Sequence, residues 1–89
     1  MSVKLVVALY DVKAELFHNP FTVPALGVAY RNLADQVAMV GDKDNVLSQH
    51  PGDFELWKLG VFDDETGFIQ GEKQPAKVCL LSDLVVVPV

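Results

Sequence analysis

The spacing of apolar residues changes along the chain, and each spacing predicts a different element. Residues 3 to 9, VKLVVAL, are apolar and rich in β-branched side chains after Lys4, which predicts a strand with much of both faces covered. The next stretch, DVKAELF, either continues this strand after a bulge or forms a second short segment. Asn19 and Pro20 then mark a turn, because proline disfavours the α region at the residue before it.

The clearest helical pattern lies between Thr22 and Gly41. Thr22 or Val23 is expected to cap the helix. Pro24 is expected in the first turn, where its missing N–H costs nothing, and Gly41 in a left-handed stop. Apolar residues recur at three- and four-residue spacing on one side, at Leu26, Tyr30, Leu33, Val37 and Val40. Arg31, Asn32, Asp35 and Gln36 occupy the opposite side. Such a stripe predicts a helix that packs on a sheet.

A loop and a short helical turn are expected after Gly41. The stretch GDKDN is polar, and Asp44 or Asn45 is expected to cap one turn over residues 46–49. Pro51 and Gly52 should end that turn.

The last third of the chain has the pattern of a hairpin followed by further strands. FELWKLGVF and GFIQ flank the acidic turn DDETG, which predicts a β-hairpin with Gly67 at positive φ. Residues 71–75 are expected to form another loop. KVCLL and LVVVPV are expected to be strands, with a bend or bulge at Ser82 and Asp83.

This order of elements predicts the α+β class. The simplest arrangement is a small, mainly antiparallel sheet of four or five strands packed with one amphipathic helix. The alternative is that the same strands curl into a small barrel, which removes exposed edges. A chain of 89 residues is expected to form one domain over residues 1–89.

Composition adds an expectation about association. Hydrophobic residues make up 51% of the chain and the mean hydropathy is +0.27, which is high for so small a domain. More apolar surface exists than one small core easily covers, so we expect a homodimer that buries an apolar patch. The alternative is a monomer with a well-filled core.

The charge and the cysteine content limit which binding partners and which cellular compartment we expect for the protein. A net charge of −5 with seven scattered cations argues against strong non-specific nucleic-acid binding, which relies on Lys and Arg at phosphates. The single cysteine, Cys79, is expected to be a buried reduced thiol, which suits a cytoplasm. The apolar run near the start is too short for a signal peptide, and no apolar stretch is long enough to cross a bilayer.

No catalytic constellation, metal-ligand spacing or phosphate loop is evident, so we expect a non-enzymatic protein without a cofactor or metal. Asp63, Asp64 and Glu65 lack the ligand spacing of a calcium loop and are interpreted as a solvated hairpin tip. His18 and His50 lie beside turn residues and are interpreted as loop histidines.

An aromatic group in the hairpin has two interpretations. Trp57 is accompanied by Phe54, Phe62 and Phe68, which could pack in the core or at an interface. Alternatively, some of these rings form a stacking platform for single-stranded bases, with Lys58 and Lys73 near the phosphates.

Four stretches resemble the small non-structural protein of gokushovirus-type microviruses, which are bacteriophages with single-stranded DNA. They are DVKAELFHNPF, YRNLADQV, PGDFELWKLGVFDDETGFI and VCLLSDLV, and together they cover most of the chain. The matching positions are Asp11, Lys13, Glu15, Asn19, Pro20, Pro51, Phe54, Trp57, Gly60, Phe62, Asp63, Asp64 and Gly67.

The resemblance implies a protein made during infection that helps to replicate or package a single-stranded DNA genome in the host cytoplasm. The residues then expected to contact single-stranded DNA are Lys13, Arg31, Trp57, Lys58, Phe68 and Lys73. The alternative is a protein-interaction module that acts on a host factor or a phage assembly protein.

Overall fold

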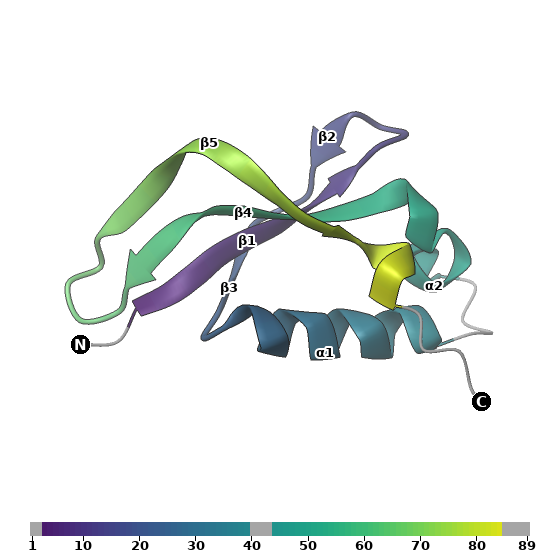
Figure 1. Cartoon of the computed structure of the whole chain (residues 1–89), viewed down its shortest axis with the longest axis horizontal. Coiled ribbons are helices and arrows are strands. Elements are labelled where there is room, and N and C mark those ends of the chain that lie inside the picture. The colour runs from purple at the N-terminus through teal and green to yellow at the C-terminus, as the bar shows by residue number, and fades with distance from the viewer. Residues whose placement is uncertain (1–2, 40–43, 85–89) are drawn as a thin grey trace.

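The protein is an α+β domain in which one long helix lies against a curled antiparallel sheet (Figure 1). The computed structural model describes residues 3–39 and 44–84. The strands run in the order β2-β1-β4-β5, and β3 also pairs with β1. The strands are β1 (Val3–Asp11), β2 (Leu16–Phe17), β3 (Phe21–Val23), β4 (Phe54–Asp63) and β5 (Ile69–Leu80). The helices are α1 (Leu26–Ala38), α2 (Val46–Gln49) and the 3₁₀ turns η1 (Pro51–Asp53) and η2 (Leu81–Leu84). The predicted class is confirmed, and the sheet forms a half-barrel.

The first strand turns back on itself at Asp11. The Oδ1 atom of Asp11 accepts hydrogen bonds from the N–H groups of Lys13 and Ala14, at 3.0 and 3.1 Å. Glu15 follows in the left-handed region with φ of 58°, and the chain then pairs Phe17 with Tyr10. The stretch DVKAELF is therefore a turn and a second short strand, which was one of its two predicted forms.

The core lies between α1 and one face of the sheet. Ala29, Leu33 and Val37 of α1 are buried. This confirms the predicted stripe at Leu33 and Val37, whereas Ala29 was not among the predicted positions. Leu26 and Tyr30 are half-buried at the margin of the core. Val40 lies outside the described residues. The sheet and η2 contribute buried side chains from Val7, Leu9, Val23, Phe54, Leu56 and Leu81.

The predicted start of the helix is wrong. Thr22 and Val23 pair with β1 as part of β3, so neither can cap α1. The N-cap is Ala25, whose side chain makes no capping hydrogen bond, and Pro24 precedes the cap. At the other end, the N–H of Met39 donates to the Gln36 carbonyl at 3.2 Å. The helix ends at Ala38, and Gly41 lies outside the described residues.

Asn45 caps α2, as predicted. Its Oδ1 atom accepts hydrogen bonds from the N–H groups of Leu47 and Ser48, at 3.1 and 3.3 Å. Its Nδ2 atom donates to the carbonyl of Gln36 at 2.9 Å. The cap therefore also ties α2 to the end of α1. Pro51 then begins η1.

Strands β4 and β5 form the predicted hairpin, and Gly67 has φ of +79° as expected. The loop predicted at 71–75 is wrong, because these residues belong to β5. Lys58 pairs with Ala76 and Gly60 pairs with Gly71, so residues 72–75 lie opposite Leu59 alone. β5 therefore arches away from β4 in its middle, as Figure 1 shows. We call residues 72–75 the arch.

The strand predicted from KVCLL extends to Leu80, and Leu81 begins η2, where its side chain is fully buried. The bend predicted at Ser82 and Asp83 is confirmed by this 3₁₀ turn. The strand predicted from LVVVPV is wrong at Leu84, which belongs to η2, and residues 85–89 lie outside the described residues.

Candidate binding surface

Three aromatic side chains contact one another on the sheet face that is turned away from α1. Successive residues of a strand point to opposite faces, so Tyr10 lies opposite to the core residue Leu9, and Trp57 opposite to Leu56. The ring centroids are 4.8 Å apart for Tyr10 and Phe17, 5.6 Å for Phe17 and Trp57, and 6.1 Å for Tyr10 and Trp57. These spacings are typical of favourable aromatic pairs. We call these three residues the aromatic cluster.

The aromatic cluster is partly open to solvent. Ala8, which pairs with Trp57, is fully buried although it faces away from the helix. Tyr10 and Trp57 are half-buried, while Phe17 is 43% exposed. The cluster therefore covers the middle of β1 and presents apolar aromatic surface to a partner.

The ion pair of Glu55 and Lys77 contacts the indole N–H of Trp57. The indole Nε1–H of Trp57 donates to Oε1 of Glu55 at 3.1 Å, and Nζ of Lys77 lies 2.9 Å from Oε2 of the same carboxylate. The hydrogen bonds from Lys77 and Trp57 lower the pKa of Glu55 below its ordinary value, against a smaller opposing effect of desolvation. The charge of Glu55 is thus compensated beside the cluster, and the indole orientation is restrained.

Of the residues predicted to bind DNA, only Trp57 belongs to the aromatic cluster. Lys58 follows Trp57 in β4 and therefore points to the other face, where its Nζ atom lies 3.1 Å from Oε1 of Glu72. Lys73 is exposed in the arch, and Lys13 is exposed in the turn after β1. Arg31 is exposed on α1.

The aromatic residues grouped with Trp57 by the sequence are dispersed. Phe54 is 4% exposed in the core, with the ring of His18 at 5.6 Å from its own. Phe62 is half-buried, and Phe68 is 65% exposed at the far end of the hairpin. The sequence did not indicate Tyr10, Phe17 or Lys77 as neighbours of Trp57, because these residues are distant in sequence and only the pairing of the strands brings them together. The one local indication is that Tyr10 follows a buried residue of β1 and must therefore point to the opposite face.

Two histidines and two acids line one pocket of about 210 Å³, which sequence analysis did not foresee. His18, between β2 and β3, and His50, between α2 and η1, are loop residues as predicted. Asp11, Asp53 and Lys13, the last of which was predicted to contact DNA, complete the polar lining. In the described part of the chain, no three His, Cys, Asp or Glu residues lie close enough together to hold a metal ion.

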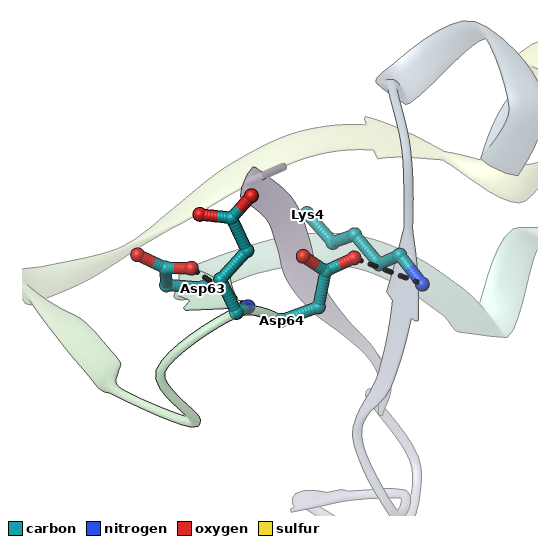
Figure 2. Close-up of polar contacts among 4 residues, drawn as sticks. Lys4, Asp63 and Asp64 are labelled. Atoms are coloured by element: carbon teal, nitrogen blue, oxygen red, sulfur yellow. Dashed lines mark hydrogen bonds and ion pairs between the residues drawn. The ribbon is translucent and has the colours of Figure 1, made fainter. Parts of the chain in front are cut away.

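The acidic turn of the β4–β5 hairpin is tied to its surroundings. Figure 2 shows Lys4 reaching the Asp64 carboxylate, with 3.8 Å between Nζ and Oδ2. Oδ1 of Asp63 accepts a hydrogen bond from the N–H of Glu65 at 2.9 Å. Asp63 therefore bonds within the turn and Asp64 pairs with β1, and both residues belong to the predicted hairpin tip.

Cys79 is half-buried near the end of β5. Burial raises the pKa of its thiol, and the nearby charge of Asp83 raises it further. The thiolate form, which a nucleophile requires, is disfavoured in these surroundings.

Together these features define a small α+β protein with a half-barrel sheet and an open face that carries aromatic side chains. The family model described as Phage ORF5 protein matches residues 4–84, and the chain belongs to this family of phage proteins. Neither the curated proteins nor the solved structures contain a significant match to the chain. No helix in the described ranges is long and apolar enough to cross a membrane.

Proposed function

We propose that this phage protein is a non-enzymatic accessory factor that binds single-stranded DNA through the aromatic cluster. In this proposal it acts in the host cytoplasm and assists replication or packaging of the single-stranded genome of a gokushovirus-type microvirus. The observation that supports it best is the exposed ring of Phe17 packed beside Tyr10 and Trp57 on a sheet face that none of the described helices covers. Aromatic side chains on an open sheet are a common platform for unpaired bases.

The affinity would come mainly from stacking. Each stacked base contributes about 1–3 kcal/mol, whereas the net charge of −5 opposes a polyanion at long range. Close to the cluster the repulsion of phosphates is weaker, because the positive charge of Lys77 offsets the negative charge of Glu55. The side chain of Lys77 is 47% exposed, so its ammonium group can also approach a phosphate.

This mode of binding predicts a weak dependence on salt. Each phosphate neutralised on a single strand contributes about −0.7 to the slope of log Kobs against log salt concentration. With one or two phosphates at Lys77 and its surroundings, we expect a slope of roughly −0.7 to −1.4. Lys13, Arg31, Lys58 and Lys73 lie on several parts of the molecule, and full use of all of them would give a much steeper slope.

The test is a titration of labelled oligothymidylate followed by fluorescence anisotropy at low and high salt. Trp57 is the only tryptophan, so quenching of its emission reports contact at the cluster in the same experiment. We expect a rise in anisotropy together with quenching. Absence of binding at low salt would refute the proposal.

A matched pair of variants locates the site. Phe17→Ala removes the most exposed ring of the cluster and should weaken binding about 5- to 150-fold, the equivalent of one lost stacking contact. Leu16→Ala is the control, because Leu16 is the other residue of β2, is 66% exposed and points to the opposite face. Equal effects of the two substitutions would remove the cluster from the proposal.

An alternative function is binding of a phage or host protein by the same cluster. The observation that favours it is the compensated charge of Glu55 beside an apolar aromatic surface in an acidic chain. Aromatic side chains are enriched at protein interfaces. This alternative predicts no binding of DNA and a stoichiometric protein partner that is lost with Phe17→Ala and retained with Leu16→Ala.

A further inference from the structure

The sheet face turned away from α1, which we call the open face, continues beyond the aromatic cluster toward the β4–β5 hairpin. Side chains of β1 alternate between the two faces, so Lys4 and Val6 point to the open face as Tyr10 does. Residues that pair across neighbouring strands point to the same face, so Phe62, the partner of Lys4, lies there too. Ile69 of β5 pairs with Phe62 and extends this row.

A bulge in β4 brings Trp57 and Phe62 to the same face. The two residues are five positions apart, and in a regular strand they would point to opposite faces. The pairing with β1 passes over Leu59, at the register shift between Val6 and Val7, and one extra residue reverses the alternation. Both rings therefore lie on the open face. Their partners in β1 are four residues apart, which corresponds to roughly 13 Å.

An apolar groove lies beside Phe62. It has a volume of about 240 Å³ and is lined by Val6, Pro20, Phe21, Thr22, Phe62 and Ile69. This volume is below the range of about 300–1,000 Å³ of pockets that hold a drug-sized ligand, and it suits a single nucleobase. Phe62 is half-buried and Ile69 is 65% exposed, so apolar surface is available to the face of a base.

Each of the two rings has a lysine directly across from it on a neighbouring strand. Trp57 pairs with Lys77 of β5. Phe62 pairs with Lys4 of β1, whose Nζ atom is 3.8 Å from the Asp64 carboxylate, as Figure 2 shows. The side chains of Lys77 and Lys4 are 47% and 40% exposed, so both ammonium groups are accessible to a phosphate. The combination of a ring and an accessible cation, which single-strand binding requires, therefore occurs twice on the open face.

The surface between the two rings is formed by glycine. Gly60 and Gly71 pair with each other, two positions before Phe62 and two after Ile69, so they lie on the open face. A Cβ atom added at Gly71 would meet only the carbonyl oxygen of Leu59, at 4.0 Å, which leaves the space above the backbone open. The arch stands beside these glycines, on the side of the sheet away from α1 (Figure 1).

We propose that the groove beside Phe62 is a second base-binding subsite, and that one single strand of DNA runs from the aromatic cluster over Gly60 and Gly71 to this groove. The inference rests on the proposed binding of single-stranded DNA by the cluster. The roughly 13 Å between the rings corresponds to about four nucleotides at the stacked spacing of 3.4 Å, and to fewer in an extended strand. The complete site would then hold roughly four to six nucleotides, at the lower end of the range for one small β-barrel domain.

The first experiment measures affinity against the length of the strand. Oligothymidylates of two, four, six and eight nucleotides are titrated into the full chain, and quenching of Trp57 reports binding. We expect the affinity to rise about 5- to 150-fold between two nucleotides and six, the equivalent of one further stacked base, and then to level off. The slope of log Kobs against log salt concentration should become steeper by about 0.7, because Lys4 adds one phosphate contact.

The outcomes separate this inference from the proposed function. An affinity that does not change with length would overturn the second subsite and leave DNA binding at the aromatic cluster in place. Absence of binding at every length would refute both.

A matched pair of charge variants tests the path between the subsites. Gly71→Glu places a carboxylate on the open face between the two rings. Gln70→Glu makes the same change of charge one residue away, on the opposite face, because Gln70 pairs with Val61. Gly71→Glu should abolish the gain in affinity with length, and Gln70→Glu should retain it, while the two variants bind two nucleotides equally. The same length dependence in both variants would overturn the path over the glycines.

A second pair of variants tests the groove itself. Phe62→Ala should remove the gain with length, whereas Val61→Ala should retain it, because Val61 is equally half-buried but points to the other face. Circular dichroism shows whether each variant is folded, and Gly71→Glu tests the subsite without altering Phe62. Sedimentation without DNA tests a second copy of the chain as the occupant. A dimer that is lost with Phe62→Ala and retained with Val61→Ala would assign the groove to that copy and overturn the proposal.

Discussion

Leu56 and Trp57 are neighbours in β4, yet they lie in two different environments. Leu56 faces α1 and is fully buried among aliphatic side chains, whereas Trp57 faces away from the helix and packs with Tyr10 and Phe17. One face of the sheet is closed by α1, and on the other face, within residues 3–39 and 44–84, the aromatic rings give only partial cover. The comparison predicts that the closed face carries most of the stability, and the open face is the one that we propose for binding.

The difference between the faces is expected to be largest in the free energy of unfolding. Leu56→Ala leaves a cavity under α1 and should lower this free energy by about 2–5 kcal/mol. Phe17→Ala on the open face removes partly exposed aromatic contacts and should lower it by less than about 1.5 kcal/mol. Urea unfolding followed by circular dichroism measures both values. Similar losses for the two variants would break the distinction between the faces.

At Gly60, the backbones of β4 and β5 pack closely against each other. A Cβ atom at this position would collide with the carbonyl oxygen of Gln70 and lie 3.0 Å from Cα of Gly71. Gly60→Ala should therefore push β5 away from β4 and cost about 1–3 kcal/mol of stability.

Gly27 provides the control for this substitution. A Cβ atom at Gly27 meets nothing within 4 Å, and alanine is favoured over glycine within a helix by up to about 1 kcal/mol. Gly27→Ala should therefore be neutral or stabilising in the same urea experiment. A Gly60→Ala variant as stable as the wild type would show that β5 tolerates displacement there.

The smallest expected effect concerns the charged pair beside the aromatic cluster. Because the pKa of Glu55 is lowered in the folded state, its contribution to stability is present above its ordinary value of 4.5 and disappears as the pH falls through the folded-state pKa below that value. Glu55→Gln should therefore lower stability by up to about 1 kcal/mol at pH 7. The difference from wild type should vanish in acid.

To check this loss of the difference in acid, the free energy of unfolding is measured for wild type and for Glu55→Gln as the pH is lowered from 7. Lys77→Met should reproduce the loss at pH 7, since it removes the other half of the pair. A difference between wild type and Glu55→Gln that is constant with pH would show that the carboxylate charge is not what holds the indole.

Much of the fold was predictable because it depends on the spacing and the conformational preferences of residues that are close in sequence. The spacing of Leu33 and Val37 predicted the buried side of α1, and Gly67 and Asn45 predicted a turn and a cap from their own conformational preferences. The class, the single long helix and the hairpin followed from these patterns. The phage origin rested on resemblance, and the family match confirms it at that level.

What the sequence did not predict depends on contacts between distant residues. Thr22 has the character of a helix cap, but pairing with Val6 places it in β3. Similarly, Phe17 reaches Trp57 only because β1 lies between β2 and β4. The sequence left open whether the aromatic residues near Trp57 pack in the core or form a platform. Residues three apart in a strand point to opposite faces, so Phe54 lies in the core while Trp57 lies on the open face.

The arch of β5 also determines how far the sheet can extend. β5 is the last strand of the ordered path in the described sheet, and a flat outer strand would offer its free N–H and C=O groups to further chains. The displaced residues 72–75 and the missing N–H of Pro75 interrupt that row of groups, and Lys73 adds an exposed charge. Addition of a further chain along this border, as in fibril growth, is therefore disfavoured.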